Sequence, residues 1–133
     1  MGITAQADEV VLRLPLANDA ELRAVDALDH LLARHRVEQS AAGQARFALV
    51  EACLNAIEHG NEAVEVRMAI NGGELQISVG NPGVPFVPPA QTSSKPGRGH
   101  GLKIIHAFMD QVHYSSDSDG TRLEMTKLLG TSS

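Results

Sequence analysis

Two short runs of alternating apolar residues constrain the fold most, because they predict a β-hairpin with one buried face. The apolar positions of the two runs are Val64, Val66, Met68 and Ile70, then Leu75, Ile77 and Val79. Alternation with a period of two is typical of a strand that buries one side. The residues between the runs, "NGG" at 71–73, are a strong turn signal. A sheet with one apolar face has to be covered, so helices are expected on that face.

The N-terminal half predicts one more strand and two covering helices. Residues 9–16 alternate like a strand, and Pro15 favours the edge of a sheet. A helix is expected over 19–35, with Asn18 as its cap and Glu21 in the capping-box position. A second helix is expected from about Ser40 to Gly60. The predicted buried stripes are Leu22, Val25, Leu28 and Leu32 in the first helix, and Phe47, Val50, Leu54 and Ile57 in the second.

The C-terminal half predicts a long loop, a helix and a final hairpin. The loop is "GNPGVPFVPPAQTSSKPGRG", about twenty residues without apolar periodicity, and loops of this length are often functional. A helix is expected over 101–111, with Leu102, Ile105 and Met109 on its buried side. The final hairpin would turn at Asp119-Gly120. The order of elements predicts one α+β domain over 1–133, a two-layer sandwich in which three helices cover one face of a mostly antiparallel mixed sheet.

Composition and charge exclude several classes of protein. Hydrophobic residues make up 43% of the 133 residues and charged residues 20%, which is typical of a globular chain and not of a disordered one. A net charge of −5 argues against a nucleic-acid partner. Since the sequence shows neither a long apolar stretch nor a signal peptide, no membrane association is expected, and we predict a cytoplasmic protein. The six histidines lack the spacing of a zinc site, and the single Cys53 is expected in the core.

A polar pair in the second helix is the first candidate for chemistry. In "EACLNAIEHG" (51–60), Glu51 and Asn55 are four residues apart and share one face of a helix. Asparagine has poor propensity in the middle of a helix, which indicates a role for its side chain. A carboxylate and a carboxamide suit a Mg²⁺ ion that keeps several waters and a phosphate. The alternative interpretation is a solvated polar face.

A glycine-rich stretch before the third helix is the second candidate. In "GRGHGLKIIH" (97–106), three glycines precede an apolar helical pattern. Glycines allow backbone N–H groups to approach an anion, and the helix N-terminus offers unpaired donors and a favourable dipole. A phosphate-binding loop and a flexible hinge are both consistent with this pattern alone.

Taken together, these motifs resemble the GHKL (Bergerat-fold) ATPases, and specifically the anti-sigma-factor serine/threonine kinases. "EACLNAIEHG" resembles the N-box of that family, "GRGHGLKIIHAFMDQVHY" its glycine-rich lid with the following helix, and "DGTRLEMTK" its terminal strand pair. The resemblance extends from about residue 9 to residue 128. It implies a Bergerat fold that binds ATP and Mg²⁺. It further implies transfer of the γ-phosphoryl to a serine of a STAS-domain antagonist, sequestration of an alternative sigma factor, and a homodimer.

The resemblance also assigns roles to individual residues. Glu51 would be the general base and Asn55 the Mg²⁺ ligand, while Thr121 would lie near the adenine. Gly97, Gly99 and Gly101 would cradle the phosphates, with Arg98 adding charge. The remaining residues implied to contact the nucleotide are His59, Asn81, Gly83, His100 and Leu102.

The sequence departs from the family pattern beside the expected adenine pocket. The family motif is Asp-x-Gly-x-Gly-Phe, whereas this chain has "NPGVPF", with Asn81 for the aspartate and Pro85 for the second glycine. A carboxamide oxygen accepts without charge assistance, which costs on the order of 1–2 kcal/mol. Two interpretations follow: a working kinase with an altered pocket, or a non-catalytic module with a degenerate pocket that only sequesters its partner. Retention of Glu51 and Asn55 favours the kinase.

Overall fold

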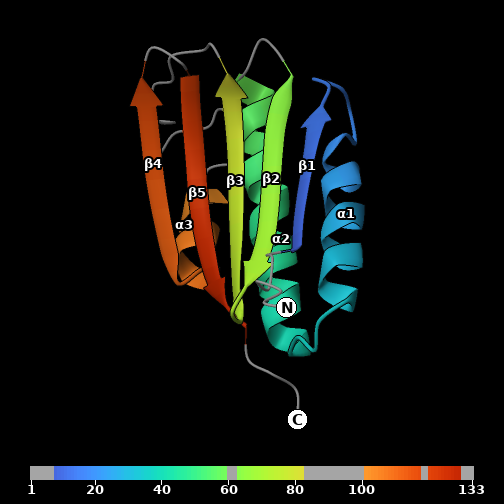
Figure 1. Ribbon diagram of the computed structural model, residues 1–133. Coiled ribbons are helices and arrows are strands. Elements are labelled where there is room, and N and C mark those ends of the chain that lie inside the picture. Colours follow the sequence, from blue (N-terminus) through green and yellow to red (C-terminus); the bar gives the residue numbers. More distant parts are fainter. Residues whose placement is uncertain (1–7, 60–62, 83–100, 118–119, 130–133) are drawn as a thin grey trace, which may run out of the picture.

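The computed structural model describes residues 8–59, 63–82, 101–117 and 120–129, which form a sheet with helices on one face (Figure 1). In chain order the elements are β1 (Asp8–Leu14), α1 (Glu21–Ala33), α2 (Gln39–His59), β2 (Val64–Asn71), β3 (Glu74–Pro82), α3 (Gly101–Phe108), β4 (Gln111–Asp117) and β5 (Gly120–Leu128). The strand order is β1-β2-β3-β5-β4, and every pair is antiparallel. The predicted α+β class is confirmed, although the sheet of the described strands is antiparallel throughout and not mixed.

The predicted hairpin and the predicted edge strand are both present. β2 and β3 pair in register from Glu65–Gly80 to Asn71–Glu74, and Gly72 and Gly73 form the turn with φ of 62° and 79°. These left-handed angles cost little only at glycine, which explains "NGG" at this position. β1 lies at the sheet edge and ends at Leu14, before Pro15, so Leu16 is outside the strand and 39% exposed.

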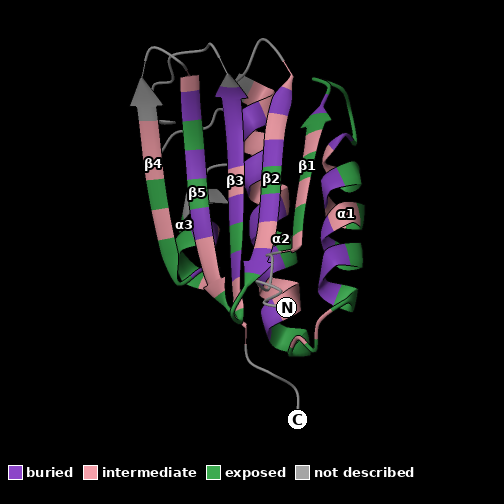
Figure 2. Ribbon diagram, in the orientation of Figure 1, coloured by how far each residue is buried: buried purple, intermediate pink, exposed green. Residues whose placement is uncertain are grey.

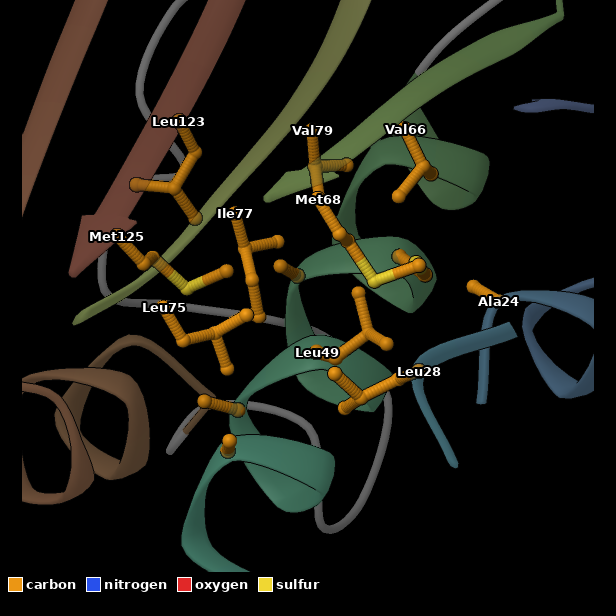
Figure 3. Packing of buried hydrophobic residues seen from close by; sticks show 14 of the residues in the cluster. Ala24, Leu28, Leu49, Val66, Met68, Leu75, Ile77, Val79, Leu123 and Met125 are labelled. Carbon is orange, nitrogen blue, oxygen red and sulfur yellow. The ribbon is translucent and has the colours of Figure 1, made fainter. Parts of the chain in front are cut away.

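The core lies between the sheet and the helices (Figure 3). On β2 and β3 the alternating residues of the sequence pattern face the helices and are buried. Leu28 of α1 and Leu49 of α2 are fully buried and approach the sheet from the helix layer. Burial follows this layering, since α1 turns its exposed residues away from the sheet (Figure 2).

The predicted buried stripes of both helices are wrong in part. In α1, Leu28 and Leu32 are buried as predicted, but Leu22 is 56% exposed and Val25 is half-buried. In α2, Phe47 is 50% exposed, and Val50, Leu54 and Ile57 are only half-buried. The residues of α2 that are buried are mostly small: Ala41, Ala45, Ala48, Leu49, Ala52, Cys53 and Ala56. Small side chains let the helix approach the sheet closely. A stripe predicted from the most hydrophobic residues overlooks them, because alanine is only weakly hydrophobic.

The predicted cap of α1 is also wrong. Ala20 occupies the N-cap position, and no side chain caps the helix there. Backbone turns satisfy the first amides instead, because Leu22 N–H donates to Asp19 O at 3.0 Å and Arg23 N–H donates to Ala20 O at 3.1 Å. Asp19 has a φ of 67°, a left-handed conformation that aspartate tolerates better than most residues.

The C-terminal elements follow the sequence prediction with a shorter helix. α3 ends at Phe108 instead of 111, while Ile105 and Met109 are buried as expected. β4 and β5 form the predicted hairpin, and Gly120 has a φ of 130°. Among the described residues, no helix is both long and apolar enough to cross a membrane.

The close packing of α2 on the sheet can be tested by enlarging its buried face. Ala48 is fully buried, so Ala48→Leu is expected to lower the free energy of unfolding by about 1–3 kcal/mol through overpacking. Gly43, in the same helix, has no neighbouring atom within 4 Å of the position that a methyl group would take, so Gly43→Ala is expected to raise that free energy by about 0.5–1 kcal/mol. Urea unfolding measures both. Equal, small effects would contradict the assignment of the buried face.

Candidate functional site

Two buried polar side chains interrupt the apolar face of the sheet. Asn81 on β3 is 4% exposed and Thr121 on β5 is 6% exposed, and all other buried residues in the described part of the chain are apolar. The two are register partners across the β3–β5 pair. A buried polar side chain is costly unless it has a partner, so a pair placed side by side indicates a specific role.

The polar pair borders a small cavity under the last turns of α2. Its volume is about 10 Å³, roughly the room that one water molecule requires. The lining residues are Ala52, Asn55 and Ala56 of α2, Val79 and Asn81 of β3, Tyr114 of β4, and Thr121 and Leu123 of β5. Three residues that the sequence singled out, Asn55, Asn81 and Thr121, therefore meet at one place although they lie far apart in the chain.

Asn81 is held by a hydrogen bond to the backbone of α2. Its Nδ2 donates to the Ala56 carbonyl oxygen at 3.0 Å. Ala56 lies in the last turn of α2, where carbonyl groups run out of partners further along the helix and carry the negative end of the helix dipole. The bond uses the amide nitrogen and so leaves the carboxamide oxygen as the acceptor. A donor suits this position better than a carboxylate would.

Gly80 allows the two strands to lie close together beside the polar pair. A Cβ at this position would lie 3.0 Å from the Thr121 carbonyl oxygen, which is closer than side chains normally approach. The absence of a side chain therefore permits the close approach of β3 and β5 next to Asn81 and Thr121.

Glu51 and Asn55 lie one turn apart on α2, and both are half-buried. Asn55 borders the cavity, whereas Glu51 is one turn closer to the helix N-terminus and does not line it. Among the described residues, no group of three or more His, Cys, Asp or Glu is placed to hold a metal ion. Asn55 offers a side-chain oxygen at the cavity, which is the kind of ligand that suits Mg²⁺, an ion that keeps much of its hydration shell.

Several predicted site residues lie outside the described part of the chain. Gly83, Gly97, Arg98, Gly99 and His100 belong to this group, as does Pro85. Gly101 and Leu102 are the first two residues of α3, and His59 is the last residue of α2. Their proposed contacts with a nucleotide stay predictions.

Two residues near the site have strongly shifted proton affinities. Burial raises the pKa of Tyr114, which the sequence analysis missed, to about 12, so its hydroxyl stays protonated at neutral pH. Tyr114 is the register partner of Leu123, and paired residues lie on the same face of the sheet. Both side chains therefore line the cavity. Burial, and to a lesser extent the charge of Glu21, raises the pKa of Cys53 to about 12. Cys53 is fully buried, which confirms the prediction that it is a core residue.

Comparison with known proteins identifies the class. A family model described as a histidine kinase-like ATPase domain matches residues 15–127. The chain belongs to this family, within the GHKL superfamily, as the motifs of the sequence suggested.

One relative is similar to this chain in sequence, and two solved structures are similar to it in fold. The chain is 30% identical over 102 residues to the serine-protein kinase RsbW of Bacillus licheniformis, and the match covers 63% of each protein. The chain thus spans less than two thirds of that relative. Among solved structures, the RsbU and RsbW domains of Rv1364c from Mycobacterium tuberculosis give a TM-score of 0.72 at 21% identity, covering 92% of this chain and 32% of that one. A blue-light activated histidine kinase of Erythrobacter litoralis gives 0.52 at 18% identity, covering 96% and 70%. Both likenesses support the fold.

The hydrogen bond to Ala56 predicts the effect of restoring an acid at residue 81. Asn81→Asp is expected to lower the free energy of unfolding by about 1–3 kcal/mol at neutral pH, because a buried carboxylate would face a carbonyl oxygen at the negative end of α2. The native state then favours the protonated carboxyl, so the loss is absent well below pH 4 and grows as pH rises through that region.

An exposed asparagine provides the matched control for this substitution. Asn71→Asp, at an exposed strand end, is expected to change the free energy of unfolding by less than about 0.5 kcal/mol. Urea unfolding at several pH values measures both variants. Unchanged stability of Asn81→Asp at neutral pH would show that the Ala56 carbonyl does not determine the orientation of residue 81.

Proposed function

We propose that the chain is an ATP-dependent serine-protein kinase that also sequesters an alternative sigma factor. The observation that supports this most is the buried pair of Asn81 and Thr121, which borders one cavity with Asn55 in a chain of the histidine kinase-like ATPase family. A purely structural sheet would have no need for two buried polar side chains at this place.

Asn81 is the residue that selects the adenine in this proposal. Because its nitrogen donates to the Ala56 carbonyl, its oxygen accepts from the exocyclic amino group of the base. The cavity itself has room for about one water molecule and not for a base, so the adenine would bind outside it, next to Asn81. Thr121 supplies a hydroxyl beside Asn81.

Asn55 and Glu51 divide the chemistry between them. Asn55 would hold Mg²⁺ through its side-chain oxygen, and the bound metal would supply positive charge beside the phosphates. Glu51, one turn away, orients the serine hydroxyl of the substrate and takes its proton. Gly97, Gly99 and Gly101, with Arg98, bind the phosphates ahead of α3. Catalysis rests mainly on positioning and electrostatics, as is usual for phosphoryl transfer.

The relatives support the class of substrate of the proposed kinase, and its individual partners are part of the proposal. The similarity to a protein named serine-protein kinase supports a protein substrate, and we propose a STAS-domain antagonist that accepts the phosphoryl group on serine. The second partner is an alternative sigma factor, held by a homodimer of this chain in the cytoplasm.

A second candidate is a non-catalytic module that sequesters its partner without phosphorylating it. Asn81 and Pro85 support this alternative, because both replace residues of the family's adenine motif. The two candidates differ in whether the chain binds ATP at all.

Calorimetric titration with ATP and Mg²⁺ separates the two candidates. The native chain is expected to bind ATP with micromolar affinity. Asn55→Ala is expected to bind ATP in a manner that no longer depends on Mg²⁺, because the variant loses the proposed metal ligand. An absence of ATP binding by the native chain would favour the non-catalytic module.

Phosphoryl transfer to a STAS-domain protein tests the role of Glu51. Glu51→Gln is expected to retain ATP binding and to slow transfer by roughly a hundredfold or more, since a general base contributes about that factor. Glu38→Gln is the matched control, because Glu38 is exposed and its carboxylate accepts a hydrogen bond from the neighbouring Ser40 hydroxyl. A native rate for Glu51→Gln would remove Glu51 from the mechanism.

A further inference from the structure

A lysine follows two buried apolar residues on the side of β5 that faces the helices. Along β5, Leu123 and Met125 are buried on this side, and Lys127 occupies the next position of the same row. Lys127 is half-buried. An ammonium group turned toward a helix layer has to be compensated by hydrogen bonds.

Lys127 joins the last residue of α3 and the second turn of α2 to the sheet. Its Nζ donates to the carbonyl oxygen of Phe108, the last residue of α3, at 2.6 Å and to Oε1 of Gln44 in α2 at 2.5 Å. A positive charge at the C-terminal end of a helix also interacts favourably with the helix dipole.

Two further hydrogen bonds beside Lys127 reinforce the attachment of α3. The Asp110 N–H donates to the Thr126 carbonyl at 2.8 Å, and the Leu128 N–H donates to Asp110 Oδ2 at 2.7 Å. Phe108 also packs edge-on against Phe47 of α2, with ring centroids 5.7 Å apart. The C-terminal end of α3 is therefore fixed to both β5 and α2.

The side of α2 that Lys127 contacts is the side that carries the proposed chemistry. Gln44, Glu51 and Asn55 are separated by seven and four residues, which places them on one side of the helix. Gln44 accepts the hydrogen bond from Lys127, so this side of α2 is joined at Gln44 to the residue that also holds the end of α3. α3 has eight residues and a length of about 12 Å, so the position of its first residue, Gly101, depends on how its last turn is held.

We propose that Lys127 is a positioning residue, which fixes α3 against the side of α2 that bears Glu51 and Asn55. It thereby keeps the start of α3 in place for the phosphate groups of the nucleotide. This proposal rests on the proposed function, because it concerns the same nucleotide site. It differs from a merely stabilising role, in which Lys127 would affect folding without affecting one part of the ligand more than another.

The test compares Mg-ATP with adenosine, which lacks the phosphates. Lys127→Met keeps the aliphatic stem and removes the donors. Calorimetry well below the melting temperature is expected to show an approximately tenfold weaker affinity for Mg-ATP and less than about a threefold change for adenosine, since hydrogen bonds from charged groups contribute at this level. Lys127→Arg is expected to recover part of the affinity. Arg67→Met, which removes an exposed positive charge from β2, is the control and is expected to change neither affinity.

Two results would overturn the proposal: an equal loss of affinity for both ligands, or no loss for either. If Lys127→Met does not fold, Gln44→Met removes one of the two acceptors and is expected to shift the ratio of affinities in the same direction by a smaller factor. If the native chain binds no ATP, the proposed function fails, and hydrogen exchange still tests the anchor. Amides at 105–109 are expected to exchange faster in Lys127→Met while those of β2 and β3 do not, and unchanged exchange would refute the anchor.

Discussion

The close packing of α2 on the sheet is the constraint on which the rest of the structure depends. The buried side of α2 consists mainly of alanines, with Cys53 and Leu49, so the helix lies near the strands. This approach brings the Ala56 carbonyl within 3.0 Å of Asn81 and makes Asn55 part of the same cavity. A larger residue at Ala52 or Ala56 would separate the helix from the strands and remove these contacts. The close packing that builds the core therefore also sets the geometry of the site.

The candidate site continues the pattern that builds the core. On β3 the alternating apolar residues end with Val79, and the next position on the same face is Asn81. On β5 the same face carries Thr121, then Leu123 and Met125, and then Lys127. β5 thus has an apolar centre with a polar residue at each end, one at the cavity and one at the end of α3. The strand therefore reaches from the cavity to the end of α3.

The sequence predicted the strands better than the helix faces, and the difference has a physical cause. Strand residues alternate with a period of two and end at glycine or proline, and these signals depend on local chemistry alone. The faces of α1 and α2 depend on tertiary packing, in which alanine is buried at close approach while Phe47 is left half exposed. That Asn55, Asn81 and Thr121 belong to one site was predicted from the resemblance to a family and not from their spacing in the sequence. The Ala56 carbonyl left no trace in the sequence, because a backbone acceptor is common to every residue.

The asparagine at position 81 is better explained by its surroundings than by loss of function. A carboxylate there would be 4% exposed, beside a carbonyl oxygen at the negative end of α2, and a buried charge without a partner is strongly unfavourable. A carboxamide is neutral, donates to that carbonyl and still offers an oxygen to a ligand. A pocket that had lost its ligand would be more stable with an apolar residue at this position, because a buried polar group contributes little net stability even when it is paired. The pair of Asn81 and Thr121 therefore fits the proposed nucleotide pocket better than it fits a pocket that has lost its ligand.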